Sequence, residues 1–232
     1  VERETFGEQV LMAKAARSVN RSANLALAFS MALHFREQAE RRAGVTPEAK
    51  KPLAALDKPA LDVKPLLPLL ERGDLLFFEG QGARLERISV LGVVERSKTK
   101  VLEVMRDAKG FGAALVPGSS AEIVSAKDGV TTFDWDIGLP LVGVSGRMRM
   151  NDTERGAKIE ATAGAMRGGQ WHFDTKRLHK HATLVTGWAR FGFEESNWLL
   201  EKLVKNDAYL GHGISAASEV MLMRALRSRA TR

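Results

Sequence analysis

The first forty residues carry apolar side chains at the spacing of an α-helix. Side chains three and four positions apart share one helix face, and the positions that follow this rule are Leu25, Ala28, Phe29, Ala32 and Leu33. Gly44 comes directly after the pattern, and a glycine just past the last periodic residue is a common helix end. The pattern therefore predicts a helical N-terminal segment over residues 1–44.

The next segment, residues 45–73, carries five prolines. Proline lacks a backbone N–H and disrupts both helix interiors and central strands, so this density predicts a linker, or a strap that lies over another surface. Four leucines near its end could form one anchoring turn: Leu66, Leu67, Leu69 and Leu70.

The remaining residues, 74–232, read as the main domain. The stretch from Arg84 to Pro117 predicts one strand followed by two short helices. Short runs with period-two alternation, separated by turn residues, indicate an antiparallel meander. The seven predicted strands are Arg84–Glu95, Ala121–Ser125, Thr131–Ile137, Val142–Met150, Lys158–Ala163, Gln170–Thr175 and Thr183–Phe193. From Ser196 the period returns to 3.6, which predicts a long C-terminal helix.

The two helical ends of the chain share a pattern of leucine, alanine and arginine. Residues 24–41 and 213–230 match in order, with a shift of one residue between two blocks. One interpretation is that the N-terminal segment is the remnant of a second copy of the domain. The other is that any two amphipathic helices of this composition look alike, and the sequence leaves both open.

Alternation along the strands sorts large apolar side chains onto one face of the sheet. Phe133 and Trp135 share a face opposite Asp134 and Asp136, for example. A sheet that curls around one helix, with several methionines, favours a ligand cavity between the two. The residues predicted to line it are Phe133, Trp135, Ile137, Val144, Met148, Met150, Trp171, Phe173, Val185, Phe191, Trp198, Val220 and Met221.

The composition narrows the choice of partners. Thirty-five basic residues against 28 acidic ones give a net charge of +7 and a pI near 9.8, which allows contact with nucleic acid or an anionic membrane. The basic residues are dispersed and follow no RNA-binding motif, which argues against nucleic acid. Four arginines cluster near the end of the chain and favour transient contact with a membrane surface: Arg224, Arg227, Arg229 and Arg232.

The sequence contains no apolar run of the roughly 18 residues needed to cross a bilayer and no visible signal peptide. We therefore expect a cytoplasmic protein that can associate peripherally with a membrane. Nothing in the sequence predicts its oligomeric state.

Motifs for catalysis, metals and cofactors are scarce. There is no GxGxxG, P-loop or nucleophile elbow, and the absence of cysteine excludes thiolate chemistry. The tract His179-Lys180-His181 has no carboxylate cluster beside it in sequence, so we predict neither a metal site nor a cofactor. We also assign no catalytic residue.

Several segments together resemble the START-like, helix-grip superfamily, and within it the polyketide cyclase/dehydrase and coenzyme Q-binding branch. They are Ile88–Pro117, the strand pair Thr131–Met150, Gly168–Trp171 and the tail Trp198–Arg229. The resemblance covers residues from about 74 to 230 and is mainly one of pattern and element order. In its first helix the family often has a tryptophan where this chain has Leu102.

The resemblance implies an α+β fold in which a curved, seven-stranded antiparallel sheet grips a long C-terminal helix. Here that fold would have an N-terminal helical extension. The resemblance also implies binding of a hydrophobic molecule such as a lipid, sterol, isoprenoid quinone or polyketide. The leading hypothesis is a non-enzymatic carrier of such a molecule.

Two alternatives stay open. A cyclase or aromatase would use the same cavity but would need polar groups inside it, and the candidates are His172, Arg147 and Arg149. The strand pattern places these on the polar face, so they would enter the cavity only if that face turned inward. The other alternative is a membrane-associated interaction module built on the N-terminal helices. For ligand entry we predict a movable edge over Val101–Pro117, with Val101, Met105, Phe111 and Leu115 as its gate.

Overall fold

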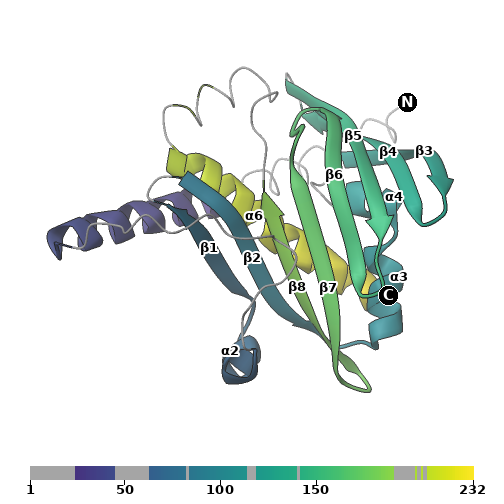
Figure 1. The fold of residues 1–232 in the computed structure, drawn as a ribbon, viewed down its shortest axis with the longest axis horizontal. Helices are drawn as coiled ribbons and strands as arrows, with labels where there is room; N and C mark the ends of the chain where they lie inside the picture. The colour runs from purple at the N-terminus through teal and green to yellow at the C-terminus, as the bar shows by residue number, and fades with distance from the viewer. Residues whose placement is uncertain are drawn as a thin grey trace, which may run out of the picture.

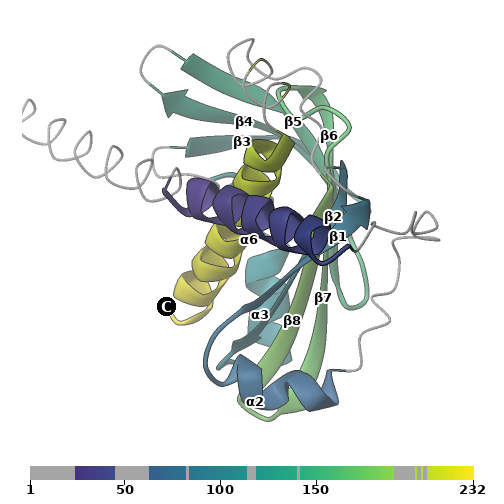
Figure 2. The ribbon, with the colours of Figure 1, turned by 90° about the vertical axis from the view of Figure 1, so that its left-hand side faces the viewer.

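A computed structural model describes residues 24–44, 63–81, 84–113, 119–139, 142–190, 202, 205 and 208–232. Its largest element is one eight-stranded antiparallel sheet, in the order β1-β2-β8-β7-β6-β5-β4-β3. The strands are β1 (Leu75–Gln81), β2 (Arg84–Val94), β3 (Ser119–Lys127), β4 (Val130–Leu139), β5 (Val142–Asp152), β6 (Gly156–Gly164), β7 (Gln170–His179) and β8 (Ala182–Arg190). The sheet curves around the long C-terminal helix α6, Ala208–Ala230 (Figures 1 and 2).

The sheet has one strand more than the seven predicted. The additional strand, β1, contains the run Leu75-Leu76-Phe77-Phe78, which does not alternate between apolar and polar residues. The alternation is missing because both faces of β1 are covered. Phe77 packs with the cluster on the outer face of the sheet, whereas Leu76 packs against the main core and the Phe78 ring lies 5.9 Å from that of Phe29 in the N-terminal helix.

Helices cover both faces of the sheet. The concave face meets α6, α3 (Lys98–Met105) and α4 (Ala108–Gly112), whose side chains join one core with β2 and β4–β8. On the outer face a short 3-10 helix, η1 (Lys64–Leu66), leads into α2 (Leu67–Leu70). Leu70 is buried there with Leu91 and Leu184, so the predicted leucine turn anchors the end of the proline-rich segment to the sheet.

The N-terminal helix, residues 24–42, lies across the beginning of α6 (Figure 2). It ends at Gly44, which has the positive φ of +70° that favours glycine. A glycine also allows the close approach of the two helices: a Cβ on Gly213 would lie 3.2 Å from the Ser30 nitrogen and nearer still to the Ala26 carbonyl. The His34 and Tyr209 rings pack edge to face at 4.3 Å, and Tyr209 donates a hydrogen bond to Glu37.

Candidate functional site

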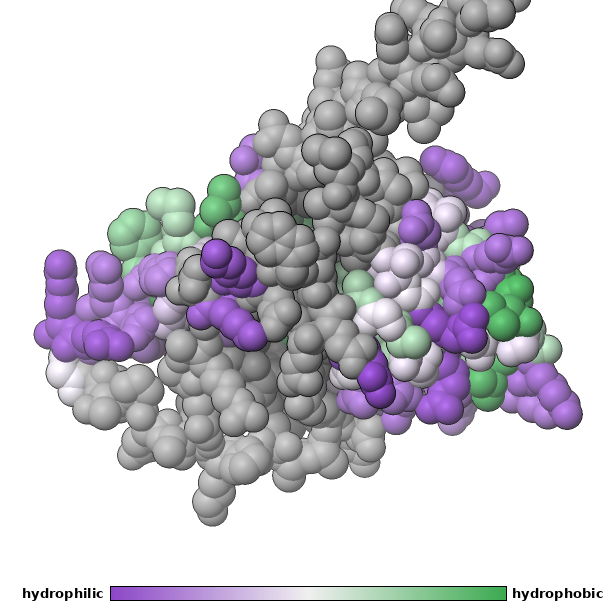
Figure 3. Space-filling view, turned by 90° about the horizontal axis from the view of Figure 1, so that it is seen from above, coloured by the Kyte–Doolittle hydropathy of each residue, from purple (hydrophilic) through white to green (hydrophobic). Residues whose placement is uncertain are grey.

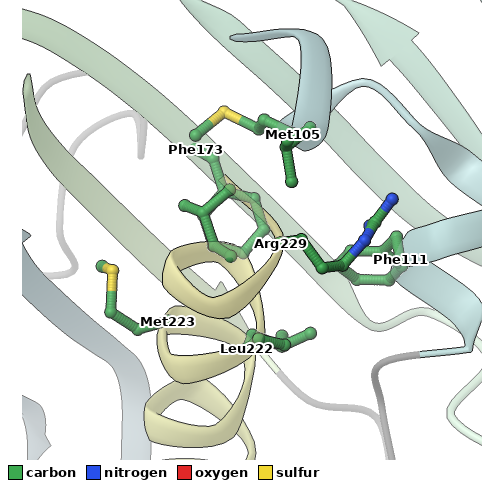
Figure 4. A pocket seen from close by; sticks show the side chains of 9 residues that line it. Met105, Phe111, Phe173, Leu222, Met223 and Arg229 are labelled. Atoms are coloured by element: carbon green, nitrogen blue, oxygen red, sulfur yellow. The ribbon is translucent and has the colours of Figure 1, made fainter. Parts of the chain in front are cut away.

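A cavity opens where α3, α4 and β7 meet the C-terminal half of α6 (Figure 4). Its walls are apolar except for one arginine at the end of α6. The residues that line it are Val104, Met105, Phe111, Phe173, Leu222, Met223, Ala225, Leu226 and Arg229.

Local sequence signals place the two short helices at this cavity. Ser97 caps α3 by accepting a hydrogen bond from the Lys100 N–H, and the helix buries Val101, Val104 and Met105 on one side. Asp107 caps α4 by accepting from the Gly110 N–H at 3.0 Å. Because one residue, Arg106, separates α3 from Asp107, both helices turn their apolar sides toward α6 and the sheet.

Two ion pairs hold the last turns of α6 against its surroundings. Arg229 pairs with Asp107, the cap of α4. Arg227 pairs with Asp74 through its Nη1, 2.8 Å from Oδ2, and donates from Nε to the Val93 carbonyl at 2.9 Å. The Arg229 guanidinium is therefore engaged at the rim of the cavity, and the other lining residues are apolar.

The cavity is nearly closed in this conformation. It measures about 420 Å³ with the space at its open mouth, but only about 30 Å³ of it is wide enough for the centre of a water molecule. Pockets for small organic ligands are about tenfold larger than this free space. A ligand could enter only if α3, α4 or α6 moved outward.

Most of the predicted lining residues on the sheet pack tightly in its core. Seven are buried in the cluster that also contains Leu222 and Met223: Phe133, Trp135, Met148, Met150, Trp171, Phe173 and Val185. Of these, Phe173 borders the cavity. The side chains of Ile137 and Val144, and the whole of Phe191 and Trp198, lie outside the part that the structure describes.

On α6 the buried stripe lies at different positions from those expected. Val220 and Met221 are half-buried, whereas Leu222 and Met223 are 6% and 1% exposed and line the cavity. Alanines and glycines supply much of the buried face of α6, so the large apolar residues alone do not define which side meets the sheet. Only the packing of α6 against β2 decides which side of the helix is buried.

The three polar residues considered for the cavity lie on the outer face of the sheet. Arg147 forms a bidentate ion pair with Asp134, with Nε 2.7 Å from Oδ1 and Nη2 2.9 Å from Oδ2. Arg149 pairs with Glu160, with Nη2 2.8 Å from Oε2. His172 is buried on that same face, with its Nε2 3.2 Å from an Asp174 oxygen and its ring 5.3 Å from that of Trp188. None of the three enters the interior, because the strand alternation holds.

Two of the four predicted gate residues line the cavity. Met105 and Phe111 line it, and Val101 is buried behind them in the same core. Leu115 lies outside the described residues. Whether this edge moves stays a prediction.

Among the described residues, the interior contains one acidic side chain, and it is not among the site residues predicted from the sequence. Glu219, midway along α6, is fully buried, and neither carboxyl oxygen has a hydrogen-bond partner in the described part of the chain. Burial raises the pKa of Glu219 to about 8. A signal was available in the sequence: Glu219 stands three or four residues from Ala216, Leu222 and Met223, on a stripe that is otherwise apolar.

The described residues contain no group of three or more histidine, cysteine or carboxylate side chains placed to hold a metal ion. None of the helices in the same ranges is long and apolar enough to cross a membrane.

Comparisons with known proteins bear on the fold. No protein-family model matches the chain, and no curated protein matches it. Among solved structures, TTHA0849 from Thermus thermophilus has a TM-score of 0.52 and 13% identity, over 62% of this chain and 97% of that one. The Zhui aromatase/cyclase from Streptomyces sp. R1128 has a TM-score of 0.52 and 16% identity, over 63% and 94%.

A STAR-related lipid transfer protein from Xanthomonas axonopodis is similar over 69% of this chain and 99% of that one, with 15% identity and a TM-score of 0.46. At these identities the two likenesses with a TM-score of 0.52 show the fold alone. The protein has the START-like, helix-grip fold: an α+β architecture with one antiparallel sheet around a C-terminal helix. The predicted fold class is thus confirmed, with eight strands in place of seven.

Proposed function

We propose that this protein binds a hydrophobic small molecule, without converting it, between the concave face of the sheet and α6. The observation that carries the proposal is the apolar cavity between α3, α4 and α6. Removing apolar surface from water yields about 25 cal/mol per Å², so such walls favour an apolar ligand. Methionine side chains at the cavity and behind it, including Met105, Met148 and Met223, can adapt to ligands of different shapes.

Because the free volume of the cavity is small, a ligand can bind there only if the cavity opens. Binding must displace packed side chains or move α4 and the last turns of α6 apart, which costs part of the binding energy. The contact between these elements supports such an opening, because α4 has only five residues and its Asp107–Arg229 ion pair lies at the partly exposed rim.

A tryptophan in the cavity wall tests the proposal. Ala225 lines the cavity, and an Ala225→Trp indole would fill it, whereas Ser228→Trp places the same group on the exposed side of α6. With the neutral dye N-phenyl-1-naphthylamine, we expect saturable binding at one site in the original protein and in Ser228→Trp. We expect affinity at least tenfold lower in Ala225→Trp.

Dye fluorescence and circular dichroism would be measured on all three proteins. Equal affinity in Ala225→Trp and the original protein, with unchanged circular dichroism, would show that the dye binds elsewhere and would contradict the proposed cavity. Mass spectrometry under native conditions would then identify any molecule that co-purifies from cells.

An aromatase/cyclase-type enzyme is the second candidate. Glu219 supports it, because an interior carboxyl with a pKa of about 8 can give and take a proton near neutral pH. A cyclase would convert a linear poly-β-ketone to a ring product detectable by liquid chromatography with mass spectrometry. A carrier would release the same compound unchanged.

A further inference from the structure

Glu219 is a carboxyl group in an environment that does not stabilise it. The side chain is 0% exposed, and both oxygens lack a hydrogen-bond partner in the described chain. Burying a polar group without a partner costs free energy, and an apolar side chain of similar size would avoid that cost. The position thus costs stability, which is typical of residues kept for a function.

The helix geometry places this carboxyl between α6 and the sheet. Leu222 and Met223, three and four residues further on, lie on the same side of the helix and line the cavity. A Cβ on Gly92 of β2 would lie 3.2 Å from the Met223 sulfur, so this side of α6 faces β2. Glu219 stands one helical turn before these two residues, so it lies next to the cavity along α6 and is not one of the lining residues.

Among the described residues, no charged side chain pairs with Glu219. On β2 and β8 the concave face includes the buried apolar residues Val90 and Val185. The described titratable groups on the N-terminal helix and at the beginning of α6 include His34, Glu37, Tyr209 and His212. Arg227 and Arg229, further along α6, pair with Asp74 and Asp107.

A buried carboxyl in such surroundings holds its proton at neutral pH, and burial raises its pKa to about 8. In this form it has one O–H donor and a carbonyl acceptor. It is then complementary to a neutral oxygen, as in a ketone, quinone or hydroxyl group. An ionised carboxylate on the ligand would find no cation among the described interior residues.

We propose that Glu219 is the polar recognition group of the interior, and that its protonated carboxyl donates a hydrogen bond to a carbonyl or hydroxyl oxygen on an otherwise apolar ligand. This inference rests on the proposed function, because it names the chemical class of the molecule bound there. The apolar walls would supply most of the affinity, and Glu219 would select one oxygen-bearing end.

Two probes with the same carbon skeleton separate these contributions. Menadione carries two ring carbonyls, and 2-methylnaphthalene carries none. The chain contains no cysteine, so menadione cannot form a thiol adduct. Equilibrium dialysis at pH 6 would give the affinity of each probe for the original protein, Glu219→Gln and Glu219→Leu.

We expect the original protein to prefer menadione over 2-methylnaphthalene by about fivefold, the factor that one neutral hydrogen bond typically contributes. Glu219→Leu should lose this preference and still bind 2-methylnaphthalene. Glu219→Gln should keep it, because its amide N–H₂ also donates to a carbonyl. Above pH 8 the original protein should lose the preference as the carboxyl ionises, whereas Glu219→Gln should show no such change.

The results distinguish failure of this inference from failure of the proposed function. If both probes bind and the ratio of their affinities is the same in the original protein and Glu219→Leu, the recognition role is wrong and the apolar cavity stands. If neither probe binds the original protein, both proposals fail.

Discussion

At the scale of single residues, the same type of side chain has opposite roles on the two faces of the sheet. On the outer face Asp134 accepts two hydrogen bonds from Arg147, and these lower the pKa of Asp134 below its usual value. Both residues are about half exposed, so the pair contributes little to stability. On the inner face the Glu219 carboxyl is buried without a hydrogen-bond partner among the described residues, and burial shifts its pKa upward.

Glu219 should make the stability of the protein depend on pH. Its folded-state pKa of about 8 lies above the 4.5 of an ordinary glutamate, so the folded state binds more protons between these values. Its contribution is then fully present below pH 4.5 and is lost as pH rises to about 8, at about 1.4 kcal/mol per pH unit. Urea unfolding of the original protein and Glu219→Gln should show a stability difference that changes by about 3 kcal/mol from pH 5 to pH 7.

Glu219→Gln is the matched control here, because it keeps the size of the side chain and cannot ionise. A difference between the two proteins that stays constant from pH 5 to pH 7 would show that Glu219 ionises normally in the folded state.

At the scale of elements, Asp107 joins two structures that are far apart in sequence. Its side chain caps α4 at the Gly110 N–H and pairs with Arg229 near the end of α6. The cap orders a helix of five residues, whereas the ion pair is partly exposed. Helix caps typically contribute about 1 kcal/mol, and exposed ion pairs contribute less than that.

The two roles of Asp107 can be separated by substitution. Asp107→Asn keeps a capping oxygen and removes the charge, so the free energy of unfolding should fall by less than about 0.5 kcal/mol. Asp107→Ala removes both, and it should lower the free energy of unfolding by about 1 kcal/mol and speed amide hydrogen exchange over residues 108–113. Equal effects of the two variants would show that the ion pair, and not the cap, holds α4 in place.

At the scale of the whole molecule, the N-terminal helix packs across the beginning of α6. On one side of this helix, Ala26 and Ser30 pack against Gly213 of α6. The other side presents exposed apolar residues, which are Leu27, Met31 and Phe35 at 52%, 56% and 64% exposure. Figure 3 shows apolar surface over this helix on the left and over β3 on the right, amid largely polar surroundings.

Docking of the N-terminal helix should depend on the absence of a side chain at Gly213. A Gly213→Val side chain would overlap the backbone at Ala26 and Ser30, so we expect the helix to detach while the sheet stays folded. Limited proteolysis should then cut within residues 24–44 at least tenfold faster. Ser228→Val, on the exposed side of α6, is the control and should leave the rate unchanged. A slow rate in Gly213→Val would mean that the two helices do not depend on this contact.

The sequence alone determined the elements whose signals are local. Alternation such as Phe133-Asp134-Trp135 depends only on one strand having a buried and a solvated face, and all seven strands predicted in this way are present. For the same reason it placed Arg147, Arg149 and His172 opposite the apolar face. The strand β1 was missed because both of its faces are covered. The outer face packs against η1 and α2, which directly precede it in the chain, and the other face packs against the main core and the N-terminal helix, so its residues do not alternate.

Only the tertiary structure decided the site. The rotation of α6 about its axis depends on which of its residues meets β2, and this brings Leu222 and Met223 to the cavity in place of Val220 and Met221. The same rotation buries Glu219, a residue that would be ordinary on a solvated helix face. A helix period specifies which residues share a side, but burial and an altered pKa arise only when other parts of the chain remove water from that side.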